Sequence, residues 1–260
     1  MNIKILVATH KKYWMPTDSV YLPIQVGSAI HDDLGYCHDD TGDNISFKQP
    51  NYSELTAIYW AWKNLKADYY GINHYRRYFS RASNNVFRTA DLKELFSAED
   101  FEKMLKKASI ILPKKRNYFI ETRYEQYKNA HNIKDLETCK LVLGDLYPDY
   151  IKTFDLVMNK RRGHIMNMFV MRKDLFYSYC DWLFSILFTI EPKISLEGYS
   201  PYQQRVFGYL SERLLDVWIE FNHIEYLEAN YVILEKVNWP KKVANFLSKK
   251  LQGPKEFHGH

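Results

Sequence analysis

The segment HYRRYF, residues 74–79, gathers side chains that bind anions. It contains one imidazole, two guanidinium groups and two phenols. Guanidinium groups bind phosphate oxygens through two parallel hydrogen bonds and stay charged at any relevant pH. His74, Arg76 and Arg77 are therefore candidates to neutralise a pyrophosphate. Structural salt bridges at the end of a strand are an equally weighted interpretation of the arginine pair.

Polar residues also follow the first apolar run of the chain. Residues 3–8 form an apolar run, apart from Lys4, that leads into Thr9 and His10. A short run of this kind is typical of a buried parallel strand, and open α/β sheets bind ligands beyond the carboxyl ends of such strands. Thr9 and His10 are thus predicted to lie in a ligand loop, whereas Lys11 and Lys12 also fit a solvated strand exit.

The residue types of the acidic segment DDTGDN, residues 39–44, fit either a metal site or a turn-rich loop. Carboxylate oxygens suit magnesium or manganese, but the spacing lacks the twelve-residue ligand pattern of an EF-hand. Asp, Asn and Gly also build turns. Of the two, the turn-rich loop is favoured.

Three further polar residues have candidate roles. His131 and Asp135 are four residues apart, which would place them on one face of a helix. Asn167 interrupts the apolar segment IMNMFVM, residues 165–171. Burying its amide without partners is costly, so we expect it to contact either a ligand or neighbouring backbone.

Alternating strands and helices must position these residues. Strands are predicted near 3–8, 68–75, 109–112, 163–171 and 232–237, and helices near 51–65, 91–108, 124–143, 174–188 and 202–221. Such alternation predicts an α/β sheet with helices on both faces. We expect one domain over residues 1–237, followed by a basic tail over residues 238–260.

Composition excludes several classes of protein. The net charge of +5 is mild and dispersed, unlike the concentrated basic stripe of a nucleic-acid-binding protein. Cys37, Cys139 and Cys180 are widely spaced and indicate reduced thiols in a cytosolic protein. The N-terminal sequence does not resemble a signal peptide, and no apolar run reaches the roughly 20 residues that span a bilayer.

The strings VATHKK, DDTGDNIS, NYSELTAIYWAWKN, GINHYRRYF, IILPKK, NMFVM and RVFGYLSERLLDVWI together resemble a bacterial glycosyltransferase family. That family was formerly known only as a domain of unknown function, and it occurs in capsule, exopolysaccharide and O-antigen gene clusters. The resemblance covers roughly residues 1–235 in order. It implies a single GT-A-like, Rossmann-like domain that transfers a hexose, including galactofuranose, from a UDP-sugar to a growing, lipid-linked glycan at the inner face of the cytoplasmic membrane.

The resemblance also assigns roles to the candidate residues. Donor binding falls to Thr9, His10, Asp40, Asp43, Asn44, His74, Arg76, Arg77 and Asn167, and acceptor binding to His131 and Asp135. GT-A folds usually hold a metal ion with a DxD motif, but the equivalent strand end here reads NHYR, residues 73–76. We therefore expect metal-independent transfer in which the arginines neutralise charge directly, with Mn²⁺ or Mg²⁺ as the alternative.

An inverting transferase needs a carboxylate that deprotonates the acceptor hydroxyl. Chain order in GT-A enzymes points to Glu212, and Asp135 and Glu197 are weaker candidates. The competing interpretation of Glu212 is an ion pair with Arg205 or Arg213.

The tail contains PKKVANFLSKKLQG, residues 240–253, with apolar residues at helical spacing among lysines. A basic amphipathic helix binds anionic membranes, although its apolar stripe could equally pack on the protein itself. The absence of a DxD motif leaves a different class of function open, namely a carbohydrate- or phosphate-binding module without catalysis.

Overall fold

The computed structural model describes residues 1–82 and 91–234 of the 260-residue chain. The predicted basic tail at 238–260 and the end of the predicted last strand lie outside this part. Their conformation therefore stays a prediction.

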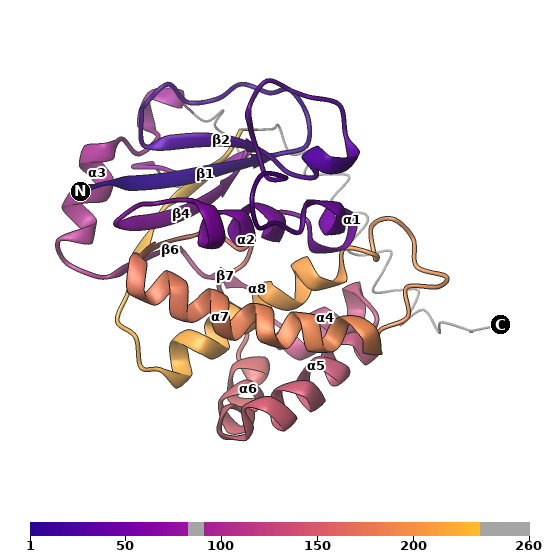
Figure 1. Ribbon diagram of the computed structural model, residues 1–260. Helices are drawn as coiled ribbons and strands as arrows, with labels where there is room; N and C mark the ends of the chain where they lie inside the picture. The colour runs from indigo at the N-terminus through magenta and orange to yellow at the C-terminus, as the bar shows by residue number, and fades with distance from the viewer. Residues whose placement is uncertain (83–90, 235–260) are drawn as a thin grey trace.

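A mixed β-sheet forms the centre of the described part (Figure 1). Its main path has the order β10-β6-β9-β4-β1-β2-β3, β5 pairs with both β4 and β11, and β7 and β8 form a separate two-stranded ribbon. The strands are β1 Ile3–Thr9, β2 Tyr21–Gln25, β3 Cys37–His38, β4 Tyr69–His74, β5 Arg77–Phe79, β6 Ile110–Pro113, β7 Arg116–Asn117, β8 Arg162–Gly163, β9 Phe169–Arg172, β10 Leu227–Ala229 and β11 Tyr231–Ile233.

The strand β1 lies parallel to both of its neighbours, β2 and β4, as the sequence predicts for a buried strand. Its apolar side chains alternate between the two faces of the sheet: Ile5 packs into one hydrophobic cluster and Leu6 into the other. Gly71 of β4 lies in the same crowded centre, where an added Cβ would be 2.4 Å from the Cδ1 atom of Ile5. An alanine at this position would therefore force the buried Ile5 side chain to move.

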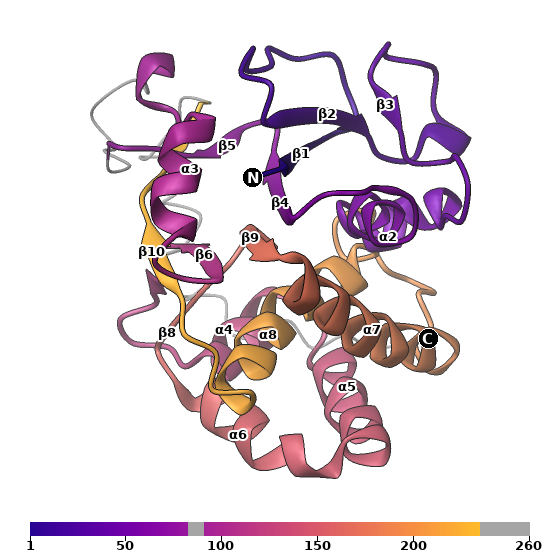
Figure 2. The same cartoon turned by 60° about the vertical axis from the view of Figure 1, so that its left-hand side comes forward.

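Helices cover both faces of the sheet, which confirms the predicted α/β arrangement. Helices α2, α7 and α8 pack on one side, and α3 covers the other (Figure 2). The helices are α1 Gln49–Tyr52, α2 Leu55–Asn64, α3 Ala98–Leu105, α4 Arg123–Ala130, α5 Ile133–Leu146, α6 Ile151–Asn159, α7 Lys173–Ile190 and α8 Val206–Phe221.

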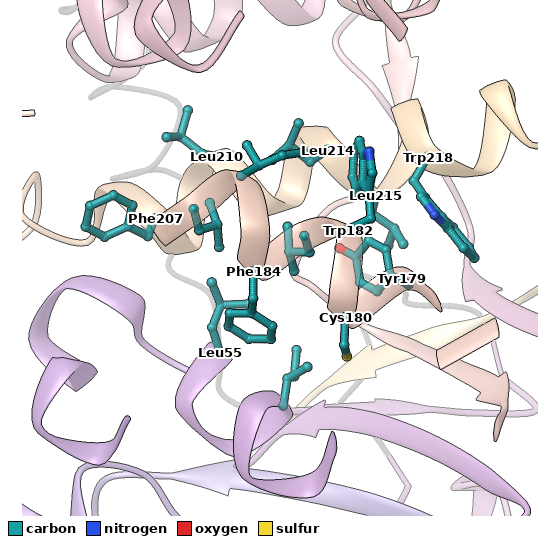
Figure 3. Packing of buried hydrophobic residues seen from close by; sticks show 14 of the residues in the cluster. Leu55, Tyr179, Cys180, Trp182, Phe184, Phe207, Leu210, Leu214, Leu215 and Trp218 are labelled. Carbon is teal, nitrogen blue, oxygen red and sulfur yellow. The ribbon is translucent and has the colours of Figure 1, made fainter. Parts of the chain in front are cut away.

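The larger core lies where α7 packs against α2 and α8 (Figure 3). Leu55, Cys180, Phe184, Phe207 and Leu214 are all buried there. Although α7 is strongly apolar, neither it nor any other helix within residues 1–82 and 91–234 has the length and hydropathy that crossing a bilayer requires.

Two predicted elements differ from the structure near the polar residues of interest. The predicted helix 51–65 is broken between α1 and α2 at Ser53, whose φ of 54° lies in the left-handed region. The predicted strand 163–171 is strand only at its two ends, because Met166 and Asn167 also have positive φ, 80° and 47°. Asn167 thus lies in a loop and not within a strand. Residues other than glycine are held in this region only when surrounding contacts enforce it.

Candidate functional site

The carboxyl ends of β1 and β4 meet at one edge of the sheet, as predicted. Ala8 is in register with His74 in the parallel pair, so the residues that follow each strand are neighbours. The Thr9 side chain is fully buried, and its hydroxyl donates to the backbone oxygen of Lys11 at 2.6 Å. Thr9 therefore shapes the turn that presents His10.

The buried ring of Tyr75 forms the floor of a basic corner. Its centroid lies 5.6 Å from that of His10 and 4.3 Å from that of His74. The Lys11 ammonium lies 5.3 Å and the Arg76 guanidinium 4.9 Å from the same centroid. Cations interact favourably with an aromatic face, so this ring holds positive groups from two strand ends side by side.

The two imidazoles of this corner are kept neutral. Burial lowers the pKa of His74 to about 2, with help from the charges of Arg77 and Arg76. Burial also lowers the pKa of His10, and the charges of Lys11 and Arg76 act in the same direction. The positive charge of the corner is thus concentrated on its lysine and arginines, while the imidazoles remain available for neutral hydrogen bonding.

Arg205, just before α8, completes this corner although the sequence analysis gave it no role in ligand binding. Its charge contributes to the lowered pKa values of both His10 and His74. Its Nε donates to the hydroxyl of Ser53 at 2.9 Å, and one terminal nitrogen lies 3.9 Å from a carboxylate oxygen of Glu54. Arg205 is far from Ser53 and Glu54 in the sequence, so no local sequence pattern predicts this contact.

Glu54 is the second residue that the sequence analysis missed. The backbone break at Ser53 turns the chain so that Glu54, at the N-cap position of α2, lies next to the loop containing Asn167. The Asn167 amide donates to the Glu54 carboxylate at 2.9 Å and to the backbone oxygen of Gly208 at 3.1 Å, while its oxygen accepts from Ser211 at 2.7 Å. Asn167 therefore joins Glu54 to α8, and its contact with a donor sugar stays a prediction.

Glu212, the predicted base, lies on α8 beside the same loop. Its side chain is 22% exposed, and its carboxylate is 3.7 Å from the guanidinium of Arg213. Burial raises the pKa of Glu212 and the charge of Glu54 adds to the rise, whereas Arg213, Arg77 and the backbone N–H of Met166 oppose it. A carboxylate with a raised pKa is a better proton acceptor near neutral pH, which suits the proposed role.

Of the two ion pairs considered for Glu212, the described part of the structure contains the one with Arg213 and not the one with Arg205. Arg213 does face Glu212, but only at 3.7 Å, and Arg205 faces Glu54 instead. Of the weaker candidates for the base, Glu197 is exposed, and Asp135 accepts a hydrogen bond from Tyr199 at 2.8 Å.

The acidic loop at residues 39–44 is held by hydrogen bonds to its surroundings. Asp39 is fully buried and accepts from two backbone N–H groups and from the hydroxyl of Ser46. Asp43 accepts from Tyr59 of α2 at 3.0 Å, and the Asn44 amide donates to the backbone oxygen of Asp40 at 2.9 Å. These contacts support the turn-building interpretation, and donor contacts by Asp40, Asp43 and Asn44 stay predictions.

His131 and Asp135 do not share a helix, contrary to the expectation from their spacing. His131 ends α4 in an extended conformation, and Asp135 lies in the first turn of α5. The His131 ring stacks on Tyr209 of α8 at 4.0 Å, and Tyr209 in turn lies 5.6 Å from the Arg205 guanidinium. An aromatic surface therefore connects the predicted acceptor residues to the basic corner.

Within residues 1–82 and 91–234, no group of three or more His, Cys, Asp or Glu side chains is placed to hold a metal ion. An activity assay with and without a chelator tests whether the reaction requires a metal ion.

The chain matches the family described as a domain of unknown function, DUF4422, over residues 4–223. It also matches a solved structure, the "WbbM bifunctional glycosytransferase apo structure", with a TM-score of 0.84 and 33% sequence identity over 90% of this chain. The match covers 46% of the WbbM chain, so this protein spans about half of that one. No curated protein sequence matches. The structural match confirms the predicted GT-A-like fold.

Proposed function

Because the chain belongs to the DUF4422 family and has the GT-A-like fold of a glycosyltransferase structure, we propose that it is a glycosyltransferase that uses a nucleoside-diphosphate sugar. The observation that carries the proposal is the basic corner at the carboxyl ends of β1 and β4, with Glu54 and Glu212 next to it. Positive groups and carboxylates in one site suit the departure of an anion together with the removal of a proton.

The basic corner is the proposed site of the donor diphosphate. Arg76 and Arg77 follow each other just after the end of β4, whereas Arg205 approaches from the segment before α8, and all three charges act on His74. Fixed positive groups stabilise the charge that develops on a leaving diphosphate without having to reorganise during the reaction. His10 and His74, being neutral, would donate or accept hydrogen bonds at the same group.

Glu212 is the proposed base. Its carboxylate removes the proton from the acceptor hydroxyl, the hydroxyl oxygen forms a bond to the anomeric carbon, and the bond from that carbon to the diphosphate oxygen breaks. Attack opposite the leaving group gives inversion. Glu54, which bonds to Asn167 and faces Arg205, is proposed to orient these groups.

The acceptor is proposed to bind over Tyr202, Tyr209 and His131. The three rings are stacked or tilted against one another, and Tyr202 is 57% exposed. Aromatic faces combine apolar area with polar edges, as sugar rings require. Buried Asp135, hydrogen-bonded to Tyr199, lies behind this surface on α5.

The finer assignment follows the resemblance in the sequence. The donor is a UDP-hexose, with UDP-galactofuranose as the first to test, and the acceptor is a lipid-linked surface polysaccharide at the cytoplasmic face of the membrane. The similarity to WbbM, a bifunctional glycosyltransferase, supports transfer but not the identity of the sugar.

The proposal is tested with the full chain, a panel of UDP-sugars and a glycan acceptor. Calorimetry should show UDP binding that is weakened about tenfold or more in Arg76→Ala, because a hydrogen bond to a charged group contributes roughly 1.5–3 kcal/mol. Arg172→Ala is the matched control, since Arg172 is exposed and paired with Asp174. Equal UDP binding by the wild type and Arg76→Ala would refute the donor site.

Two further measurements test whether the protein is catalytic and whether transfer needs a metal ion. UDP-sugar binding with neither transfer nor donor hydrolysis would favour a binding module without catalysis. Full activity in EDTA is expected for metal-independent transfer, whereas complete loss that manganese restores would refute that part of the proposal.

A further inference from the structure

Two exposed apolar side chains lie at the tip of the loop between β7 and α4. Phe119 is 74% exposed and Ile120 is 58% exposed, and Phe119 has a positive φ of 59°. The loop is nevertheless fixed at both ends, since the backbone N–H of Tyr118 donates to Arg161 and Thr122 caps α4. A well-supported turn therefore presents two adjacent large apolar residues to solvent.

The same edge of the molecule is rich in exposed cations. They come from two segments that β7–β8 pairing places side by side: Lys114, Lys115, Arg116, Lys160, Arg161 and Arg162. Lys160 pairs with Glu220 at 2.8 Å and Lys115 with Glu228 at 3.7 Å. Hydrogen bonds from Thr122 lower the pKa of Glu125, and the nearby charge of Arg161 adds to this. Cations still outnumber the acids that face them, so the edge is basic.

A cavity of about 560 Å³ opens behind this edge. Four of the exposed cations line it, together with Arg123, the carboxylates of Asp216 and Glu220, and Tyr226. The Arg123 side chain is only 1% exposed, and within the described residues its Nε–H has no hydrogen-bond partner. Asp216 already forms an ion pair with a terminal nitrogen of this guanidinium, and a buried N–H without a hydrogen-bond partner is costly.

We propose that this edge is a membrane-docking surface, in which Phe119 and Ile120 insert into an anionic bilayer and the basic cavity takes a lipid phosphate. Apolar residues that project beside lysines and arginines are complementary to anionic headgroups above a hydrocarbon layer. A protein partner would match the apolar tip but would not require the cluster of cations beside it. The surface is distinct from the C-terminal tail and from the donor site, and it does not depend on the sugar chemistry.

Vesicle co-sedimentation of the full chain tests the proposal without any nucleotide sugar. Wild-type protein should bind vesicles of phosphatidylcholine mixed with phosphatidylglycerol, and binding should fall with salt. Phe119→Ser/Ile120→Ser should weaken it about tenfold or more. Arg161→Ala/Arg162→Ala should weaken it by a similar factor, since each charge near an anionic surface contributes about fivefold.

Matched controls separate docking from general loss of apolar surface or charge. Leu141→Ser removes a side chain that is 70% exposed on α5, and Lys106→Ala/Lys107→Ala removes two exposed charges after α3. Both should bind as the wild type does. Circular dichroism and UDP affinity should be unchanged in all four variants.

Three results would overturn the proposal. The first is binding that is unchanged in the Phe119/Ile120 variant, which would place the contact elsewhere, including the tail. The second is equal binding to pure phosphatidylcholine vesicles, which would exclude a role for the cations. The third is no vesicle binding but concentration-dependent dimerisation that Phe119→Ser abolishes, which would identify a second copy as the occupant.

Discussion

Asp216→Asn is predicted to destabilise the protein severely, because this carboxylate neutralises a buried arginine. Asp216 lies on α8, forms an ion pair with Arg123, and is only 8% exposed. It also accepts from the backbone N–H of His164 at 3.0 Å and contacts the ring of His164 at 2.5 Å. An asparagine keeps the shape, but leaves the guanidinium buried without a counter-charge.

The size of the effect follows from this burial. Removing one partner of a buried pair costs about 3–5 kcal/mol, against a total stability of roughly 5–15 kcal/mol. For a chain of this length each kcal/mol lowers the melting temperature by about 2–4 °C. We therefore expect a loss of roughly 6–20 °C, measured by calorimetry at neutral pH and by urea unfolding.

The effect should also depend on pH in a defined direction. Burial raises the pKa of Asp216, but the charge of Arg123 and the hydrogen bonds from His164 outweigh it and hold the pKa below its usual range. A depressed pKa contributes stability above the unfolded-state value of about 3.9 and loses it as pH falls below that value. The difference between wild type and Asp216→Asn should therefore shrink in acid.

Asp155→Asn is the control for Asp216→Asn. Asp155 pairs with Lys140 at 2.5 Å, yet its side chain is 49% exposed, and such surface pairs contribute about 0–1 kcal/mol. If Asp216→Asn and Asp155→Asn cost the same, the reasoning from burial is wrong.

Four other outcomes are expected. Glu212→Gln should lower turnover by roughly 100-fold or more while UDP affinity stays unchanged in calorimetry, and near-normal turnover would remove it as the base. Arg205→Ala should weaken UDP binding about tenfold; unchanged affinity would place it outside the donor site. Burial raises the pKa of Asp135 to about 6 against the hydrogen bond from a tyrosine. Its contribution to stability is complete below the unfolded pKa of about 3.9 and is lost as pH rises through 6, so Asp135→Asn should gain about 1–1.5 kcal/mol relative to wild type between pH 5 and 7.5 in urea unfolding; a constant difference would contradict this. Gly71→Ala should destabilise by about 1–3 kcal/mol, since its Cβ would lie 2.4 Å from a β1 side chain, whereas Gly144→Ala, whose nearest neighbour is at 3.4 Å in a helix, should be neutral or stabilising.

Local patterns in the sequence were sufficient to predict the α/β class and the two central strands that carry the site. The apolar run before Thr9 and the segment ending at His74 predict two strands, and both form with their carboxyl ends together. This placement depends only on hydrophobic periodicity and on the rule that parallel strands share an edge. The positions of His10 and Arg76 beside Tyr75 follow from it.

The sequence could not show what depends on long-range contacts. A continuous helical pattern hides the break at Ser53, because nothing local reveals that Arg205 will bond to its hydroxyl. Glu54 was therefore missed as a site residue, and Arg205 was weighed only as an ion-pair partner. The same limit explains the misassigned conformation of Asn167, whose loop is held by Ser211 from a distant helix.

The helix α8 carries Arg205 just before its first turn, Glu212 near its middle and Asp216 one turn later. Arg123, at the cavity wall, also donates to the backbone oxygen of Glu212 at 3.1 Å. From Arg205 to Asp216 the rise is about 16 Å. If the cavity edge rests on the bilayer, α8 fixes the distance between the lipid and the site where the donor sugar reacts.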